Sequence, residues 1–307
     1  MNGKTWAAFF TLSAIWGASF LAIKLVLRDL SPFTLVAVRL ALGSIGLWII
    51  MVMTKTQLPK DRSTLLLLAL LGITNVTLPY LLIANGQQTI DSGVASILNS
   101  TTPLHALILA HFFLSDERIT WNRLLGLMIG FGGVALIFSD GQRYGFGALD
   151  WPVLRGQLLV LGGPLCYAAS GVFVRRRLRE VEPVVVGTIS ITTAFVASTL
   201  LALLVDGGIS IQMQATSWLA LLWLSVLGVS VAQVLYFFVM SQWGATRTTM
   251  VTYVIPLVSV ILGAIVLSEA VTVSRVGGFA LIAAGIALVN RKVNQPAPAR
   301  LAETGAD

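Results

Sequence analysis

Ten long apolar blocks joined by short polar connections restrict most strongly how this chain can fold. The blocks cover residues 4–26, 32–53, 63–84, 93–114, 121–138, 153–174, 185–205, 216–239, 246–267 and 273–290. A helix of about 20 apolar residues crosses the hydrocarbon core of a bilayer, and each block is close to that length. The pattern therefore predicts an all-α integral membrane protein with ten transmembrane helices.

Composition favours the bilayer over any soluble fold. Only 11% of the residues are charged and 56% are apolar, whereas soluble domains carry roughly 25% charged residues. The net charge of +7 comes from Lys and Arg between the blocks, which form no continuous face for nucleic acid. We therefore expect lipid and a small-molecule substrate as partners and no nucleic acid, and leave open whether the protein is a monomer or a homodimer.

The two ends of the chain differ from its apolar blocks. The first apolar stretch is too long for the core of a signal peptide and nine further blocks follow, so it is predicted to be the first helix. The polar, proline-bearing tail at residues 291–307 is predicted to be disordered.

Metal and cofactor chemistry finds little support in the sequence. Cys166 is the single cysteine, so neither an internal disulfide nor a cysteine cluster can form. His105 and His111 lie six residues apart, not the three or four that would place two ligands on one helix face. We expect no metal site and no cofactor.

The distribution of Lys and Arg predicts the orientation. With a cytoplasmic N-terminus, 14 basic residues fall in the inside connections and 5 in the outside ones, while Arg39 remains within the second block. Basic residues concentrate on the cytoplasmic side of membrane proteins. Both termini and the tail are therefore predicted to be cytoplasmic, in the inner (plasma) membrane of a bacterium.

The chain also repeats itself. A shift of 153 residues matches Pro103 with Pro256, and a shift of 152 matches Glu117 with Glu269 and Gly126 with Gly278. Earlier in each half, further matches pair Ser19 with Ser170, Lys24 with Arg175, Pro32 with Pro183, Gly72 with Gly228 and Tyr80 with Tyr236. Residues 1–150 and 151–290 are predicted to be two five-helix repeats. Because five is odd, the second enters the membrane inverted, as in secondary transporters.

Several of these residues also carry a resemblance to a known group. The "WGASF" segment at residues 16–20, Lys24, Pro32, Arg39, and the matching blocks at 103–117 and 256–269 resemble the drug/metabolite transporter superfamily, in its ten-helix EamA-like branch. The resemblance covers residues 4 to 290. It implies transport of amino acids, other metabolites or drugs through a central cavity lined by helices one, three, four, six, eight and nine. The first helix lacks the proton-coupling glutamate of the small four-helix exporters in that superfamily.

Two prolines at matching positions mark the predicted substrate site. Pro103 and Pro256 fall near the middles of the fourth and ninth blocks, where a proline removes the hydrogen bond to the carbonyl four residues back. The carbonyls of Asn99 and Thr252 would thereby become available to a solute. The alternative is a plain kink capped by a nearby Ser or Thr.

The wider set of candidate substrate contacts consists of polar, aromatic and proline positions in those six helices. They are Trp16, Ser19, Asn75, Tyr80, Asn99, Thr102, Pro103, His105, Tyr167, Ser170, Gln233, Tyr236, Thr252, Tyr253 and Pro256. Any one of them could instead be a packing residue, and His105 could equally make a hydrogen bond between helices. Arg39 needs a carbonyl or an acid as partner, or must extend to the interface.

Three other features have structural interpretations. Glu117 with Arg123 and Glu269 with Arg275 share one spacing, and we expect them first to link the hairpins that contain them and second to act as gate charges. Gly126, Gly130 and Gly133 form a small-residue stripe for close helix contact.

Three classes of function differ in what they require of the sequence. The sequence favours a secondary transporter of a small metabolite, with export of an amino acid or related amphipathic solute as the leading prediction. A lipid-carrier flippase or a multidrug exporter on the same scaffold remains open. A membrane-embedded enzyme is disfavoured, because no H-E-x-x-H, no G-x-S-x-G and no intramembrane acid pair occurs.

Overall fold

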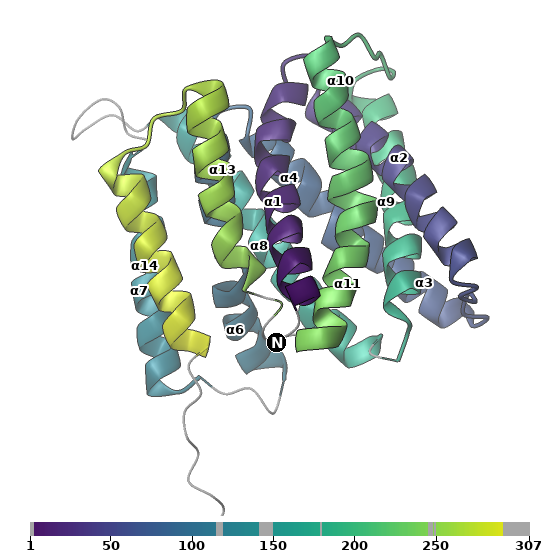
Figure 1. The fold of residues 1–307 in the computed structure, drawn as a ribbon, viewed down its shortest axis with the longest axis horizontal. Helices are drawn as coiled ribbons and strands as arrows, with labels where there is room; N and C mark the ends of the chain where they lie inside the picture. Colours follow the sequence, from purple (N-terminus) through teal and green to yellow (C-terminus); the bar gives the residue numbers. More distant parts are fainter. Residues whose placement is uncertain are drawn as a thin grey trace, which may run out of the picture.

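The fold is helical throughout the part of the chain described by the computed structural model, which comprises residues 3–114, 119–140, 150–178, 180–244, 248 and 250–290, with only the backbone for Asn290 (Figure 1). The elements are α1 (Gly3–Val26), α2 (Pro32–Met53), α3 (Arg62–Gly72), η1 (Ile73–Thr77), α4 (Leu78–Gly86), α5 (Ser92–Asn99), α6 (Thr102–Phe113), α7 (Trp121–Asp140), α8 (Trp151–Arg177), α9 (Pro183–Val205), α10 (Ala215–Leu222), η2 (Trp223–Val231), α11 (Ala232–Trp243), α13 (Val251–Leu267) and α14 (Val273–Asn290).

These elements form ten spans. Span three consists of α3, η1 and α4, span four of α5 and α6, and span eight of α10, η2 and α11. Within the described residues, eight spans are long and apolar enough to cross a membrane, and α13 and α14 are shorter apolar helices. The predicted ten-helix, all-α membrane fold is confirmed.

Polar residues in the connections define where several spans begin. Ser31 accepts a hydrogen bond from the Thr34 amide at 3.1 Å, and Asp61 accepts one from the Thr64 amide at 2.7 Å. A proline follows Ser31 at the first position of α2, where its missing N–H leaves no unmet hydrogen bond. Side-chain caps of this kind satisfy the free amides of a first helical turn.

Three spans are not regular α-helices. Span four is interrupted at Ser100 and Thr101, directly before Pro103. Spans three and eight each contain a π-helical segment, η1 and η2, at similar depths in the two halves of the chain. Such segments are often found at functional sites because the extra residue shifts the side chains that follow.

The helices pack in matched sets. Span one contacts spans eight and nine, and span six contacts spans three and four; α2 contacts α9 and η2, and α9 contacts α3 and η1. Helices α7 and α14, which are spans five and ten, lie together at one end of the molecule, whereas α2, α3 and α9 lie at the other (Figure 1). Helices α1 and α8 lie between these two groups, at the centre of the protein (Figure 1).

Glycines allow the closest of these contacts. A Cβ on Gly126 would lie 2.7 Å from the Gly285 carbonyl oxygen, and a Cβ on Gly133 would lie 2.5 Å from that of Gly278. Backbone-to-backbone contact of this kind is possible only where side chains are absent. The predicted small-residue stripe on span five is therefore confirmed, with α14 as its partner.

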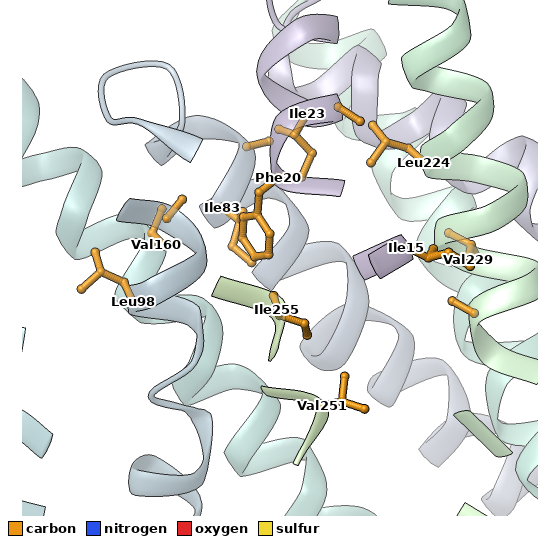
Figure 2. Packing of buried hydrophobic residues seen from close by; sticks show 14 of the residues in the cluster. Ile15, Phe20, Ile23, Ile83, Leu98, Val160, Leu224, Val229, Val251 and Ile255 are labelled. Carbon is orange, nitrogen blue, oxygen red and sulfur yellow. The ribbon is translucent and has the colours of Figure 1, made fainter. Parts of the chain in front are cut away.

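A buried apolar cluster occupies the centre. It includes Ile15 and Phe20 of α1, Ile83 of α4, Val160 of α8 and Ile255 of α13 (Figure 2). On the outside, large apolar side chains such as Phe112 and Val273 are exposed. Apolar side chains on the outer faces match a lipid environment.

Candidate functional site

Side chains from α1, α2, α4, α8, η2 and α11 meet beside the apolar core, and we call this group the central cluster. It consists of Trp16, Ser19, Arg39, Tyr80, Tyr167, Gly228 and Tyr236. Five of these seven residues were predicted as substrate contacts from the sequence; Arg39 and Gly228 were not. Every member comes from a span interior, so the polar groups of the cluster lie within the membrane-crossing part of the protein.

Trp16 and Gly228 hold one side of the central cluster. The indole Nε1 of Trp16 donates to the Gly228 carbonyl oxygen at 3.3 Å, and the Trp16 ring lies 5.7 Å from the Tyr236 ring. Ser19 donates to the Ile15 carbonyl oxygen at 2.8 Å, one turn earlier in α1. These contacts bind α1 to span eight at the π-helical segment.

Polar groups of Ser19, Trp223 and Arg39 surround the place where a side chain at Gly228 would begin. A Cβ at this position would lie 3.2 Å from the Ser19 Oγ, 3.5 Å from the Trp223 carbonyl oxygen and 3.7 Å from the Arg39 Nη2. Because these distances are at or below ordinary van der Waals contact, a side chain at this position would press against the three groups. The π-helical segment η2 carries Gly228 to this place.

Arg39 is the most unusual member of the central cluster. Its side chain is only 6% exposed, and its guanidinium carbon lies 4.3 Å from the centre of the Tyr80 ring. The Nε atom is buried without a hydrogen-bond partner, and no described carboxylate forms an ion pair with this arginine. The sequence left a carbonyl partner, an acidic partner and the interface as alternatives. Among the described residues, Arg39 meets no acid, and its buried side chain does not reach the interface.

The contact with Tyr80 does not balance the cost of burying Arg39. A desolvated cation–π contact contributes about 2 kcal/mol or somewhat more, whereas burying one ion costs several kcal/mol. The signal that could have identified Arg39 was present in the sequence, because it is the one basic residue inside an apolar block that is far from the ends of that block.

Spans three and six approach the cluster from the other side. Tyr167 of α8 and Tyr80 of α4 are half-buried and both pack against the buried apolar cluster. Ser170, one turn later, donates to the hydroxyl of Thr74 in η1 at 3.4 Å. Asn75 is half-buried in the same π-helical segment. Gln233 lies apart from these residues, with its amide beside Gly187 of α9.

The interruption of span four confirms only half of the prediction made for Pro103. The helix does break before this proline, but the Asn99 carbonyl oxygen accepts a hydrogen bond from the Thr102 hydroxyl at 2.8 Å. The prediction of a free carbonyl at Asn99 is thus wrong, because the capped kink that was its alternative is formed. The side-chain Oδ1 of Asn99 is instead the buried atom without a partner.

His105 faces away from the central cluster. Its Nδ1 lies 3.1 Å from the Thr101 carbonyl oxygen, and its ring meets Phe131 of α7 edge-on at 5.6 Å. The structure therefore gives His105 a packing position against α7.

The second predicted break is not formed. Pro256 lies inside the continuous helix α13, close to its start at Val251, and is buried. Pro256 is the sixth residue of α13, beyond the four free amides of a helix start, so it removes the helical N–H donor to the Thr252 carbonyl although the helix continues through it. Thr252 and Tyr253 are half-buried in the first turn of the same helix.

Charged groups close one end of the helix bundle, and we call this group the end network. It consists of Lys24, Asp91, Asp140, Glu269 and Arg275. Lys24 donates to the carbonyl oxygens of Gln87 and Ile90 at 2.6 and 2.7 Å. A pocket of about 440 Å³ lies here, lined in part by Lys24, Asp91 and Glu269.

Glu269 and Arg275 do not pair with each other. The Glu269 carboxylate accepts from the amides of Ser92 and Gly93 at 2.8 and 3.0 Å, at the start of α5, where a helix end favours negative charge. Arg275 lies 2.7 Å from Asp91 and 2.8 Å from Asp140. The predicted pairing of Glu269 with Arg275 is therefore not formed, because both side chains bond across to spans four and five; Arg275 still links its own hairpin by donating to the Ala270 carbonyl oxygen.

The corresponding pair in the first half is described only in part. Arg123 lies in the first turn of α7, and Glu117 lies outside the described residues. Among the residues that the structure does describe, no three His, Cys, Asp or Glu side chains come together as metal ligands would.

Comparison with known proteins agrees with this architecture. The chain is similar to the uncharacterized transporter YoaV of Bacillus subtilis, with 23% identity over 92% of this chain and 95% of that protein. It is 26% identical to a probable terminal-alkyne amino-acid exporter of Streptantibioticus cattleyicolor, over 95% of both chains. A crystal structure with 19% sequence identity superposes with a TM-score of 0.66, covering 94% of this chain and 96% of that one, and so shares the fold.

A sequence profile identifies the family. The profile described as the EamA-like transporter family matches twice, at residues 4–139 and 154–291, and so covers nearly all of the chain. The predicted resemblance is confirmed, and the interpretation as a membrane enzyme is excluded. The protein belongs to the EamA-like transporter family and is a multi-pass membrane transporter.

Proposed function

We propose that the protein is a secondary transporter that exports a small amphipathic metabolite, such as an amino acid, from a bacterial cell by alternating access. The observation that carries this proposal is the central cluster, in which aromatic rings surround polar groups within the membrane-crossing part of both halves. Transport requires such a site between two bodies that can move apart. The exporter named among the relatives supports the direction and the solute class.

The repeats at residues 1–150 and 151–290 would give the motion its symmetry, and each moving body would combine helices of both repeats, because the largest helix contacts join one repeat to the other. Three observations support the division into two repeats. The family profile matches once in each half, the helix contacts come in matched sets, and a π-helical segment interrupts the third span of each half. Two inverted repeats can exchange their conformations, which opens a shared site to each side in turn.

The end network would be the gate on the outer side. With both termini in the cytoplasm, the ends of α1 and α7 and the starts of α5 and α14 all face outward. The bonds of Glu269 and Arg275 to spans four and five hold that side together. Glu117 and Arg123, their counterparts in sequence, would act on the cytoplasmic side.

Proteoliposomes containing the purified protein test the proposal. We expect efflux of at least one member of a panel of radiolabelled amino acids to exceed that from empty liposomes, and to show competition by the same unlabelled solute. Absence of protein-dependent movement for the whole panel contradicts the proposed solute class. Fusions at residue 300 test the orientation, because a cytoplasmic end gives a fluorescent and phosphatase-inactive reporter.

A further inference from the structure

We propose that Arg39 binds the carboxylate group of the transported solute. The inference rests on the proposed function, since it names the chemical group by which the central cluster recognises its solute. It assigns a role to a residue whose Nε atom has no hydrogen-bond partner and which forms no ion pair among the described residues.

Arginines in membrane helices commonly extend to the lipid interface or pair with an acid, and Arg39 does neither. It lies seven residues after the start of α2, roughly 10 Å along the helix. With 6% of its surface exposed, it does not extend to the lipid interface. The described acidic side chains lie in connections or at helix ends, and the ion pairs of the end network involve Arg275.

A buried charge of this kind calls for an opposite charge. Ionisable residues inside membrane proteins normally pair with one another or mark the path of a substrate. Arginine cannot lose its proton to relieve the cost of burial. The Tyr80 ring offsets part of that cost, and an anionic group on the solute would supply the remainder.

The surroundings of the guanidinium fit a carboxylate. Arginine presents donors in a planar fork that matches the two oxygens of a carboxylate. The Arg39 Nη2 and the Ser19 Oγ converge beside Gly228, at 3.7 and 3.2 Å from the place that a Cβ would take there. The Trp16 and Tyr236 rings, 5.7 Å apart, provide an apolar surface for the rest of the molecule. The solute class is therefore a carboxylate that carries an apolar or aromatic group.

Thermal unfolding of the detergent-solubilised protein tests this without knowledge of the natural solute. The probes are the sodium salts of acetate, butyrate and 3-phenylpropanoate, each compared with its neutral amide and with sodium chloride at the same ionic strength. We expect 3-phenylpropanoate to raise the unfolding midpoint of the unaltered protein and 3-phenylpropanamide to leave it unchanged. This comparison uses no variant and so does not depend on the folding of one.

Substitutions locate the effect. Arg39→Gln removes the charge, and the apparent affinity for 3-phenylpropanoate should fall roughly ten-fold to one hundred-fold, as expected for a lost hydrogen bond between charged groups. Arg39→Lys keeps the charge without the planar fork and should retain part of the affinity. Arg62→Gln is the matched control, because Arg62 is exposed at the start of α3 and should leave the affinity unchanged.

Three results would overturn the inference. They are no stabilisation of the unaltered protein by any of the carboxylates, equal stabilisation by acid and amide, and equal stabilisation by chloride and 3-phenylpropanoate. Failure of the proposed function is distinguishable, because it appears as absence of amino-acid efflux from proteoliposomes while the carboxylate still stabilises the detergent-solubilised protein through Arg39.

Discussion

Single residues show how this protein tolerates polar groups within its spans. Many hydroxyl side chains bond to carbonyls one turn earlier, as Ser13 does to Phe9 and Ser225 does to Leu221, so these need no partner on another helix. Asn99 and Gln87 are different, because their side chains carry buried amide atoms without a partner. A buried polar group that lacks a partner is costly. Such positions therefore stand out from the many Ser and Thr residues that are satisfied locally.

The kink in span four gives a prediction for Thr102. Thr102→Val removes the hydroxyl that donates to the Asn99 carbonyl oxygen while keeping the shape of the side chain. We expect a loss of about 1 kcal/mol in stability, measured as a lower thermal unfolding midpoint, and only a proportionate loss of transport. Thr11→Val on the exposed face of α1 is the control and should change neither quantity. Loss of transport with an unchanged midpoint would instead identify the kink as a solute contact.

Whole elements were the easiest level to predict from the sequence. The length of each apolar block determined the spans, because only a continuous helix satisfies its own backbone in lipid. The interior of span four was predictable from Pro103, whereas the π-helical segments of spans three and eight were not. Those depend on the approach of α9 and α2, for example where a Cβ on Gly72 would lie 2.5 Å from the Ser190 carbonyl oxygen, and no local pattern reports such a contact.

The candidate site was also predictable only in part: several of its residues could be predicted from the sequence, but not the contacts that they make. Tyr80 was predictable because it recurs as Tyr236 at the matching point of the second half, and Trp16 because it lies within the first apolar block. The pairing of Glu269 with the start of α5, rather than with Arg275, could not be predicted, because it joins residues 177 positions apart. Sequence spacing predicts neighbours on one helix and cannot rank contacts between helices that meet only after folding.

The start of span three offers a pH-dependent prediction. Hydrogen bonds from the side chain and the amide of Thr64 hold the pKa of the Asp61 carboxyl below its usual value. A lowered pKa in the folded state means that the cap stabilises the protein at neutral pH and that this contribution is lost as the pH falls through that pKa. The difference in unfolding midpoint between the unaltered protein and Asp61→Ala should be constant from about pH 7 to 5 and shrink below about pH 4.

A neighbouring substitution controls for general charge effects on that end of α3. Lys60→Ala changes the net charge next to the same helix without touching the cap, and Lys60 is exposed. Its effect on the midpoint should show no such decline at low pH. A difference for Asp61→Ala that persists unchanged to pH 3 would contradict the assigned capping role.

At the scale of the whole molecule, the positions of the acids bear on energy coupling. All 13 Asp and Glu residues lie in connections, in the tail or at the ends of spans. A proton carrier within the membrane would need an ionisable group along the solute path. We expect efflux from proteoliposomes to persist when a protonophore is added. If the protonophore abolishes accumulation, His105 becomes the first residue to test as a proton carrier.

The last prediction concerns the motion that alternating access requires. Spans four and nine meet beside the end network, where a Cβ on Gly93 would lie 3.1 Å from the Val260 Cγ2 and 3.4 Å from the Val260 Cα. Cysteines at these two positions would have Cβ atoms at about the separation that a disulfide needs, 3.5–4.5 Å. Cys166→Ser removes the single native thiol, so that the combination Gly93→Cys with Val260→Cys can form only one internal disulfide.

Oxidation of that double variant should hold the outer side closed. If spans four and nine must separate there in each cycle, transport stops on oxidation and returns when dithiothreitol reduces the bond. Each single-cysteine variant should transport equally under both conditions, which separates the cross-link from the substitutions themselves. Cross-linking is verified by peptide mapping before transport is measured. Full transport by a protein that is completely cross-linked would show that spans four and nine do not part at the end network, and the gate would then have to lie elsewhere.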